Sequence, residues 1–294
     1  MYRTKIKSTI VTLLIFNFFL SFAQNDFQGK AYYMSKTTVD MSNFGGGQLS
    51  EERKKQIADR MKSSLEKTYI LTFNQSESLY KEEERLDTPG QGGGMRFSMM
   101  SATGGDQYKN LKEQKIKQEQ EFFGKQFLIS DSLQKLNWEL GTETKTIGKY
   151  ICFKATAIKT VEGFDFNSFR RPPRNNEKAK DSTNSDTKEV GAEKEEDTPR
   201  EITVTAWYTP QIPVNQGPDV YWGLPGLILE VNADRTTILC SKIILNPSEK
   251  ETLKAPSKGK LISQKEYDEI IKQKMEEMRE MFRGRGGRGG GRPR

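Results

Sequence analysis

The sequence predicts a mainly β protein: an antiparallel curved sheet or open barrel with one inserted helix, a C-terminal helix and disordered loops. Two observations support this prediction. Short runs rich in β-branched and aromatic residues are separated by glycine, proline and asparagine, which is typical of strands joined by turns. Two other stretches place apolar residues three or four positions apart, which is the spacing of an amphipathic helix.

Residues 1–23 have the pattern of a secretory signal peptide. Three basic residues precede the apolar run 9–19, and the small residues Ser21 and Ala23 stand where a signal peptidase reads the chain. Cleavage would leave Gln24 first, and the lack of a cysteine there argues against a lipoprotein. No other segment approaches the roughly 20 apolar residues of a membrane-spanning helix. The sequence therefore predicts an exported protein that is not integral to the membrane.

A β domain is expected over 24–246, and its first part combines strands with the inserted helix. Residues 29–41 alternate in polarity as a strand does. In 49–67 apolar residues recur about every four positions, which predicts an amphipathic helix with a narrow apolar stripe. The segments 68–75 and 78–81 then read as two strands joined by a short turn.

The middle of the domain contains a low-complexity insert. Residues 87–105 are so rich in glycine that we expect a disordered loop. After it, we predict two strands over 108–118 and 122–129. Periodicity alone would also allow a helix over 111–121.

Antiparallel strands are expected to continue over 137–147 and 150–161, joined by a turn at 148–149. The insert 163–200 has almost no apolar content and cannot repay the entropy of ordering, so we expect a disordered loop. The strands on either side of this insert should pair as a hairpin. A recognition role for the insert is an open alternative.

The most informative stretch is 201–245. A strand over 202–208 is followed by Pro210, Pro213 and Pro218, which remove backbone donors and favour extended geometry. We therefore expect an ordered, extended connection over 209–222. The two glycines that bracket Pro225 predict a tight turn.

A second hairpin should follow that turn. The run 227–231 is apolar, 232–234 contains turn-forming Asn232 and Asp234, and 236–245 is again strand-like.

An ordered series of short motifs spans this region and the strands before it. It consists of Trp138, Ile147 to Tyr150, Lys154-Ala155, Ala206 to Pro210, Ile212-Pro213, Gly217-Pro218 and Gly223-Leu-Pro-Gly-Leu-Ile228. This series resembles the signature of the GLPGLI family of Bacteroidetes-type bacteria, and the resemblance extends over 27–245. The chain departs from the family pattern in its inserts and its arginine-rich tail.

The resemblance implies a fold similar to the bowl-shaped amino-terminal β domain of a type II bacterial N-glycanase. It also implies a location in the cell envelope, in the periplasm, at the outer membrane or outside the cell, and genes beside TonB-dependent outer-membrane receptors. The preferred hypothesis is a non-enzymatic accessory or ligand-binding partner of such a receptor. Its contact surface would be formed by Trp207, Tyr208, Trp222 and the turn at Pro225. The alternative is that these residues only form the core.

The chain contains no histidine. This excludes Ser-His-Asp and Cys-His nucleophilic sites and removes the commonest zinc ligand. Carboxylates could still act as acid and base, but no spacing singles out a pair. An enzyme that acts on envelope glycans through carboxylates is therefore the weaker alternative.

Cys152 and Cys240 both fall in predicted strands. In an exported protein they could form a disulfide between neighbouring strands, which would stabilise the fold by about 2–4 kcal/mol. The alternative is two buried thiols.

The C-terminal region 247–282 is predicted to be a polar linker followed by an amphipathic helix. Ser263 and Glu266 have the spacing of a capping box, in which each side chain accepts from the other residue's backbone amide. An apolar stripe then follows at helical spacing, at Tyr267, Ile270, Ile271, Met275, Met278 and Phe282.

The tail 283–294 contains only arginine, glycine and proline. Without its five arginines and the three basic residues of the leader, the net charge falls from +7 to −1. In an exported protein we expect such a tail to contact an anionic envelope surface rather than nucleic acid. The alternative is a disordered tail that only aids solubility.

Two groups of methionines suggest a rival function. One lies in the glycine-rich insert and the other recurs every third residue in the last helix: Met95, Met99, Met100, Met275, Met278 and Met281. Thioethers are soft ligands that select Cu(I), so a Cu(I)-binding protein is the alternative hypothesis. No other cofactor is expected, and methionines more commonly serve as packing material.

Overall fold

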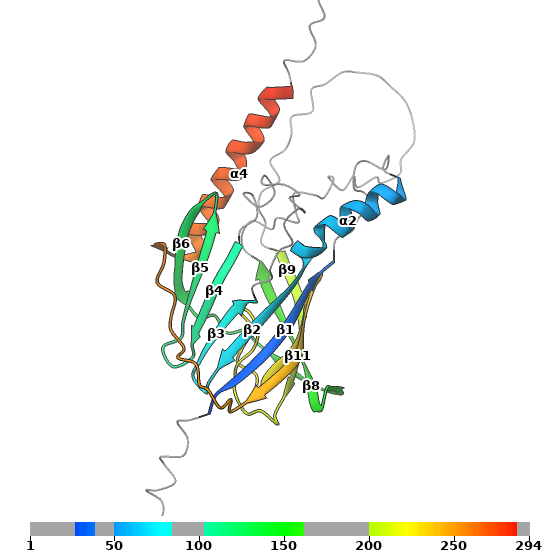
Figure 1. Cartoon of the computed structure of the whole chain (residues 1–294), viewed down its shortest axis with the longest axis vertical. Helices are drawn as coiled ribbons and strands as arrows, with labels where there is room; N and C mark the ends of the chain where they lie inside the picture. Colours follow the sequence, from blue (N-terminus) through cyan, green and yellow to red (C-terminus); the bar gives the residue numbers. More distant parts are fainter. Residues whose placement is uncertain (1–26, 39–49, 84–102, 162–199, 287–294) are drawn as a thin grey trace, which may run out of the picture.

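The computed structural model describes residues 27–38, 50–83, 103–161 and 200–286. They form a twelve-stranded sheet in the order β12-β6-β5-β4-β3-β2-β1-β11-β10-β9-β8-β7. All neighbouring strands are antiparallel except β12 and β6, which are parallel. The sheet is strongly curved, and the two helices lie towards one end of it (Figure 1). The prediction of a mainly β, curved antiparallel sheet is confirmed.

The strands are β1 (Gly29–Thr37), β2 (Glu66–Phe73), β3 (Glu77–Glu82), β4 (Thr103–Asn110), β5 (Lys115–Phe122), β6 (Lys125–Ser132), β7 (Glu139–Ile147), β8 (Tyr150–Val161), β9 (Arg200–Thr209), β10 (Leu227–Ala233), β11 (Thr236–Leu245) and β12 (Lys260–Ile262). The helices are α2 (Glu51–Leu65) and α4 (Gln264–Gly286).

Strand β1 joins the beginning and the end of the β domain. It pairs with β2 on one side and with β11 on the other, so that Gly29 lies between Phe73 and Leu245. Its side chains alternate, and Ala31 and Tyr33 are fully buried. We call the face that carries them the inner face. Buried side chains of β2, β9 and β10 share one core cluster with them.

The stretch 103–132 differs from its prediction. It forms three strands, not two, and the alternative helix over 111–121 is wrong. Asn110 ends β4, because its side-chain oxygen accepts from the amides of Lys112 and Glu113 and closes a turn. Phe123 and Gly124 both have positive φ, which suits the two-residue hairpin turn between β5 and β6.

Strand β4 also begins inside the insert that was predicted to be disordered. Residues 103–105 belong to the strand, and β4 is irregular between Gly104 and Gln107. Gly105 permits close pairing there, since a Cβ at this position would lie 2.9 Å from Cβ of Glu119. Glycine thus serves strand packing at this position.

The hairpins on the other side of the sheet agree with the sequence. The β7–β8 turn lies at Gly148 and Lys149, and Gly148 has φ +59°. Strands β8 and β9 pair from Phe153 with Tyr208 to Val161 with Arg200, although the insert between them is long. The prediction that these strands pair is confirmed.

The C-terminal region contains a strand that the sequence did not indicate. Strand β12 lies in the predicted linker and pairs with β6 through Lys260, Leu261 and Ile262. The capping box is confirmed: the Ser263 amide donates to Glu266 at 2.7 Å, and the Glu266 amide donates to Ser263 Oγ at 3.2 Å. Helix α4 then packs on β6 through a small apolar cluster of Phe122, Phe127, Ile129, Ile262 and Tyr267.

Within the described parts of the chain, no helix is both long and apolar enough to cross a membrane. The predicted signal peptide, residues 87–102, residues 163–199 and residues 287–294 lie outside the described residues. The same is true of Met95, Met99 and Met100.

Candidate functional site

The connection 210–226, between β9 and β10, lies on the inner face of the sheet, and we call it the inner segment. Along its first half, buried and exposed side chains alternate. Ile212, Val214 and Gln216 are buried, whereas the residues between them are exposed. This period of two is that of an extended chain, so the prediction of an ordered, extended connection is confirmed.

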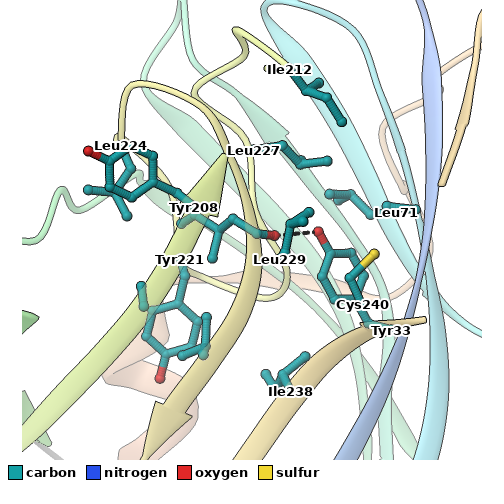
Figure 2. Packing of buried hydrophobic residues seen from close by; sticks show 14 of the residues in the cluster. Tyr33, Leu71, Tyr208, Ile212, Tyr221, Leu224, Leu227, Leu229, Ile238 and Cys240 are labelled. Atoms are coloured by element: carbon teal, nitrogen blue, oxygen red, sulfur yellow. Dashed lines mark hydrogen bonds between the residues drawn. The ribbon is translucent and has the colours of Figure 1, made fainter. Parts of the chain in front are cut away.

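One end of the inner segment is fastened by apolar packing. Ile212 and Leu227 belong to the main core together with Leu71 of β2, and Figure 2 shows these three side chains close together. The Leu227 amide donates to the Ile212 carbonyl at 3.0 Å. The hydroxyl of Tyr33 donates to the Ile228 carbonyl at 2.6 Å, drawn as a dashed line in Figure 2. We call Ile212, Val214, Leu224 and Leu227 the apolar end.

The turn at Pro225 requires both of its glycines. The Gly226 amide donates to the Leu224 carbonyl at 2.8 Å, which closes a γ-turn around Pro225. Gly223 has φ +90°, a conformation that side chains disfavour. At Gly226 a Cβ would lie 2.2 Å from the Thr209 carbonyl oxygen, which belongs to the backbone and cannot move aside. The predicted tight turn is confirmed.

The other end of the inner segment is fastened by Lys109, whose side chain is fully buried. Its Nζ donates to the carbonyls of Gly217 at 2.7 Å, Asp219 at 2.6 Å and Tyr221 at 3.4 Å. These are alternate residues of one short stretch. An ammonium has three N–H groups, so the three carbonyls use its full donor capacity.

Further buried polar groups surround this lysine, and we call the set Ser78, Gln107, Lys109, Gln216 and Asp219 the polar end. Ser78 lies opposite Lys109 in the β3–β4 register. Gln107 donates to the Asp219 carboxylate at 3.4 Å. Within the described structure, Ser78 Oγ, Gln107 Oε1 and both amide atoms of Gln216 are buried without a hydrogen-bond partner. Such groups destabilise a folded state by about 1–3 kcal/mol each.

Burial also shifts the titration of groups near the polar end. Loss of solvation lowers the pKa of Lys109 to about 7, and the Asp219 carboxylate opposes this shift. Burial, with a smaller contribution from Asp219, raises the pKa of Tyr80 and of Tyr221 well above the usual range. Both tyrosines therefore stay neutral over the range in which Lys109 titrates.

A buried lysine with a low pKa can serve as a nucleophile. Here the three carbonyls surround the nitrogen, and the side chain has no exposed surface. The arrangement thus holds a cation in place and ties the inner segment to β4.

The four residues predicted as a contact surface lie in different environments. Tyr208 and Trp222 are buried, and the Trp222 indole donates to the Gln134 carbonyl at 2.8 Å. Trp207 points to the outer face, where Lys145 Nζ lies 4.4 Å from its ring centroid. Pro225 is exposed. The structure therefore does not bring the four together, and two of them form the core.

Exposed residues of the inner segment nevertheless form a surface around Pro225. They are Pro210, Gln211, Pro213, Asn215 and Pro225, which we call the proline surface. Gly226 packs against Thr209 and Pro210, which places Pro225 beside the start of the segment. The Gly223 amide donates to the Asn215 carbonyl at 3.1 Å.

The two cysteines carry free thiols and are buried. They lie on β8 and β11, which β9 and β10 separate in the sheet. A bridge between neighbouring strands does not fit this strand order, and the structure has the alternative of two buried thiols. Burial raises the pKa of Cys152 to about 11 and that of Cys240 to about 12, so both thiols stay protonated near neutral pH.

The three methionines of α4 lie in different environments. Met275 is buried, Met278 is half-buried and Met281 is 67% exposed. On a helix with 3.6 residues per turn, Met275 and Met281 are separated by about 9 Å of rise and face different sides. These three sulfurs do not converge on one point. Among the described residues there is also no cluster of three or more cysteine and carboxylate ligands.

The sequence did not identify Lys109 as a functional residue. It stands among other lysines in a charged stretch, where a surface position is the ordinary expectation. Alternation along the strand could have identified it. Gln107 and Lys109 lie on one face of β4 and pair with Tyr80 and Ser78 of β3.

Comparisons with known proteins found a family model that matches part of the chain and solved structures that are similar to it. Residues 138–230 match the family model described as "Protein of unknown function (Porph_ging)". No curated protein matches the chain. Two crystal forms of PNGF-II are similar at 14% identity and TM-score 0.44, covering 83% of this chain and 32% or 33% of theirs. The chain thus spans about a third of PNGF-II, and its similarity to the Porph_ging family covers β7 to β10, including the inner segment.

Proposed function

We propose that this chain is an exported, non-enzymatic binding protein of the GLPGLI type. It would act in the cell envelope as an accessory or ligand-binding partner of a TonB-dependent outer-membrane receptor. The proline surface is the contact region in this proposal. It replaces the aromatic residues Tyr208 and Trp222, which are buried in the core.

The observation that carries the proposal is that the inner segment is ordered although it forms neither helix nor strand. Ordered connections longer than about 12–15 residues without helix or strand are uncommon and usually functional. This connection is fastened from inside at both ends, by Ile212 and by Lys109, while its outward side chains remain exposed. A surface that is already ordered loses little entropy when a partner binds.

The prolines strengthen this argument. Pro210, Pro213 and Pro225 present apolar rings on a backbone whose φ angle is fixed. Gln211 and Asn215 add polar atoms between them, and Gln211 accepts from the Ile151 amide at 2.9 Å. A mixed apolar and polar surface of this kind suits a protein partner.

Two features support a binding role over catalysis. The chain has no histidine. Lys109, whose pKa burial lowers to about 7, is surrounded by three backbone carbonyls. The leader-like pattern of residues 1–23 supports export. A Cu(I) site on α4 would depend on Met278 and Met281, because Met275 is buried.

Site-specific photo-crosslinking in the native cell envelope tests the proposal. A photoreactive residue is placed at Asn215 or Pro225 in the full chain, and at Gln126 of β6, also exposed, as the control. We expect both segment positions, and not Gln126, to yield an adduct with one outer-membrane receptor. No adduct, an adduct with an unrelated protein, or equal labelling from Gln126 would contradict the proposal.

A further inference from the structure

The connection 133–138, between β6 and β7, joins the two ends of the curved sheet. Strand β6 is second in the strand order and β7 is last. So short a connection spans at most about 25 Å, which requires the two ends of the sheet to approach each other. The connection crosses from one end to the other, and its contacts place it against the inner segment.

Two tryptophans tie this connection to the inner segment. The Trp138 indole donates to the Trp222 carbonyl at 2.9 Å, and the Trp222 indole donates to the Gln134 carbonyl at 2.8 Å. Leu136, between the two bonded residues of the connection, packs against the main core. The backbone is thus held in place on both sides of Lys135.

Lys135 is exposed, and its aliphatic stem lies on Gly223 of the turn at Pro225. A Cβ on Gly223 would lie 3.1 Å from Cε, 3.4 Å from Cγ and 3.6 Å from Cδ of Lys135. The absence of a side chain at Gly223 therefore allows the stem to lie this close. Lysines commonly cover a surface with the stem and keep the charged end in water.

This contact brings the lysine to the proline surface. Gly223 lies two residues before Pro225 in the same turn. Its amide donates to the Asn215 carbonyl at 3.1 Å. Both Pro225 and Asn215 belong to the proline surface, so Lys135 borders that surface at the turn.

Lys135 adds a positive charge to a surface that otherwise has none. The proline surface consists of proline, glutamine and asparagine. Among the described residues, the Lys135 ammonium has no ion pair or hydrogen bond. Lysines of β7 and β8 differ in this respect, because Lys145 pairs with Glu230 and Lys154 pairs with Glu143.

We infer that Lys135 belongs to the contact region and binds a carboxylate of the partner. The partner then presents an acidic segment, with at least one aspartate or glutamate beside the groups that pack on the proline rings. This inference deepens the proposed function by giving the partner a chemistry, and it rests on that function.

The ordered stem makes this ion pair more favourable than an ordinary surface pair. Exposed pairs usually gain little, because two flexible side chains lose freedom when they meet. The stem of Lys135 already lies on Gly223, so it loses less freedom when a carboxylate binds. Apolar rings of the proline surface would also exclude water around the pair and strengthen the attraction.

Crosslinking from a photoreactive residue at Asn215 in the native cell envelope tests the inference when Lys135 is varied in the full chain. Lys135→Glu should lower the yield of the receptor adduct about tenfold, because repulsion replaces attraction. Lys135→Met keeps an apolar stem on Gly223 without the charge and should lower the yield about threefold. Lys125→Glu, at an exposed position of β6, is the matched control and should leave the yield unchanged.

Salt gives a second readout that a merely structural role of Lys135 would not move. Screening weakens an exposed ion pair, so the native and Lys135→Met yields should converge as salt is raised from about 0.05 M to about 0.5 M. The thermal unfolding midpoints of the variants should match that of the native sequence, because Lys135 is exposed.

Equal adduct yields from the native sequence and Lys135→Glu would overturn the inference and leave the proposed function standing. An equal loss in Lys125→Glu would also overturn it, because the net charge of the chain would then explain the effect. A loss in Lys135→Met that does not respond to salt would do the same. If the native sequence gives no receptor adduct, the proposed function fails and this inference fails with it.

Discussion

The two ends of the inner segment are fastened to the same sheet by opposite means. At the apolar end, Ile212 and Leu227 are buried among side chains of β1 and β2, and their backbone groups are paired. At the polar end, Lys109 holds three carbonyls while Gln216 lies buried without a partner in the described structure.

This difference predicts different roles for the two ends of the inner segment. Apolar burial becomes more favourable with every contact and has no dependence on pH. A buried polar cluster is stable only if every member is paired, and a partly paired one lowers local stability. The apolar end should therefore set the position of the proline surface, and the polar end should set how firmly the surface is held.

Gly226→Ala should have the largest effect on the apolar end. The added Cβ would lie 2.2 Å from the Thr209 carbonyl oxygen, and relief requires movement of backbone in β9. We expect a loss of about 4 kcal/mol in the free energy of unfolding. Denaturant titration measures it, and Gly104→Ala, where the nearest atoms are 3.6 Å and 3.7 Å away, is the control. Equal stability of the two variants would refute the tight packing of the turn.

Ile212→Ala should destabilise the protein by about 3 kcal/mol, because it leaves a cavity in the main core. Ile212 is 1% exposed and packs with residues of β1, β2 and β10. Asn215→Ala, at an exposed position of the same segment, should change stability by less than about 0.5 kcal/mol. A small loss for Ile212→Ala would show that the apolar end does not anchor the segment.

Tyr33→Phe should cost about 1.5 kcal/mol, because the Ile228 carbonyl loses its buried hydroxyl donor. Thermal or denaturant unfolding measures the difference. Tyr32→Phe on the outer face of the same strand serves as the control, with an expected change below about 0.5 kcal/mol. If both variants behave alike, the bond in Figure 2 contributes no net stability.

Gln216→Leu should have the smallest effect and the opposite sign. The substitution removes two buried amide atoms that lack partners in the described structure and keeps a similar volume, so we expect stabilisation by about 1 kcal/mol. Gln126→Leu, at an exposed position, should be neutral. A clear loss of stability in Gln216→Leu would mean that the amide is paired in solution and that the two ends are less different than proposed.

Much of the fold could be predicted because local and tertiary preferences agree. Alternation predicted β1, and turn residues predicted the hairpin at Gly148. The turn predicted over 232–234 lies at Asp234 and Arg235 instead, because Asn232 still pairs with Thr237 inside the β10–β11 ladder. The capping box at Ser263 placed the start of α4 within one residue. The predictions were wrong where a pairing partner decides the structure. Strand β12 forms because β6 offers it an edge, and residues 103–105 extend because β5 lies beside them.

The candidate site was predicted less well for a related reason. Tryptophan and tyrosine are suited both to interfaces and to cores, so Tyr208 and Trp222 could not be assigned from sequence. Lys109 was overlooked because only the folded chain shows that β4 passes beneath residues 217–221. The proline positions were informative, since proline fixes the backbone locally in any context.

Amide exchange within the inner segment at neutral pH tests the contrast between its two ends most directly. The Tyr221 amide donates to Pro218 at 3.1 Å, and the Leu227 amide donates to Ile212 at 3.0 Å, so the two bonds are matched in length. We predict that Tyr221 exchanges through an opening of much lower free energy than Leu227. Equal opening free energies at the two amides would contradict the division into an anchored apolar end and an adjustable polar end.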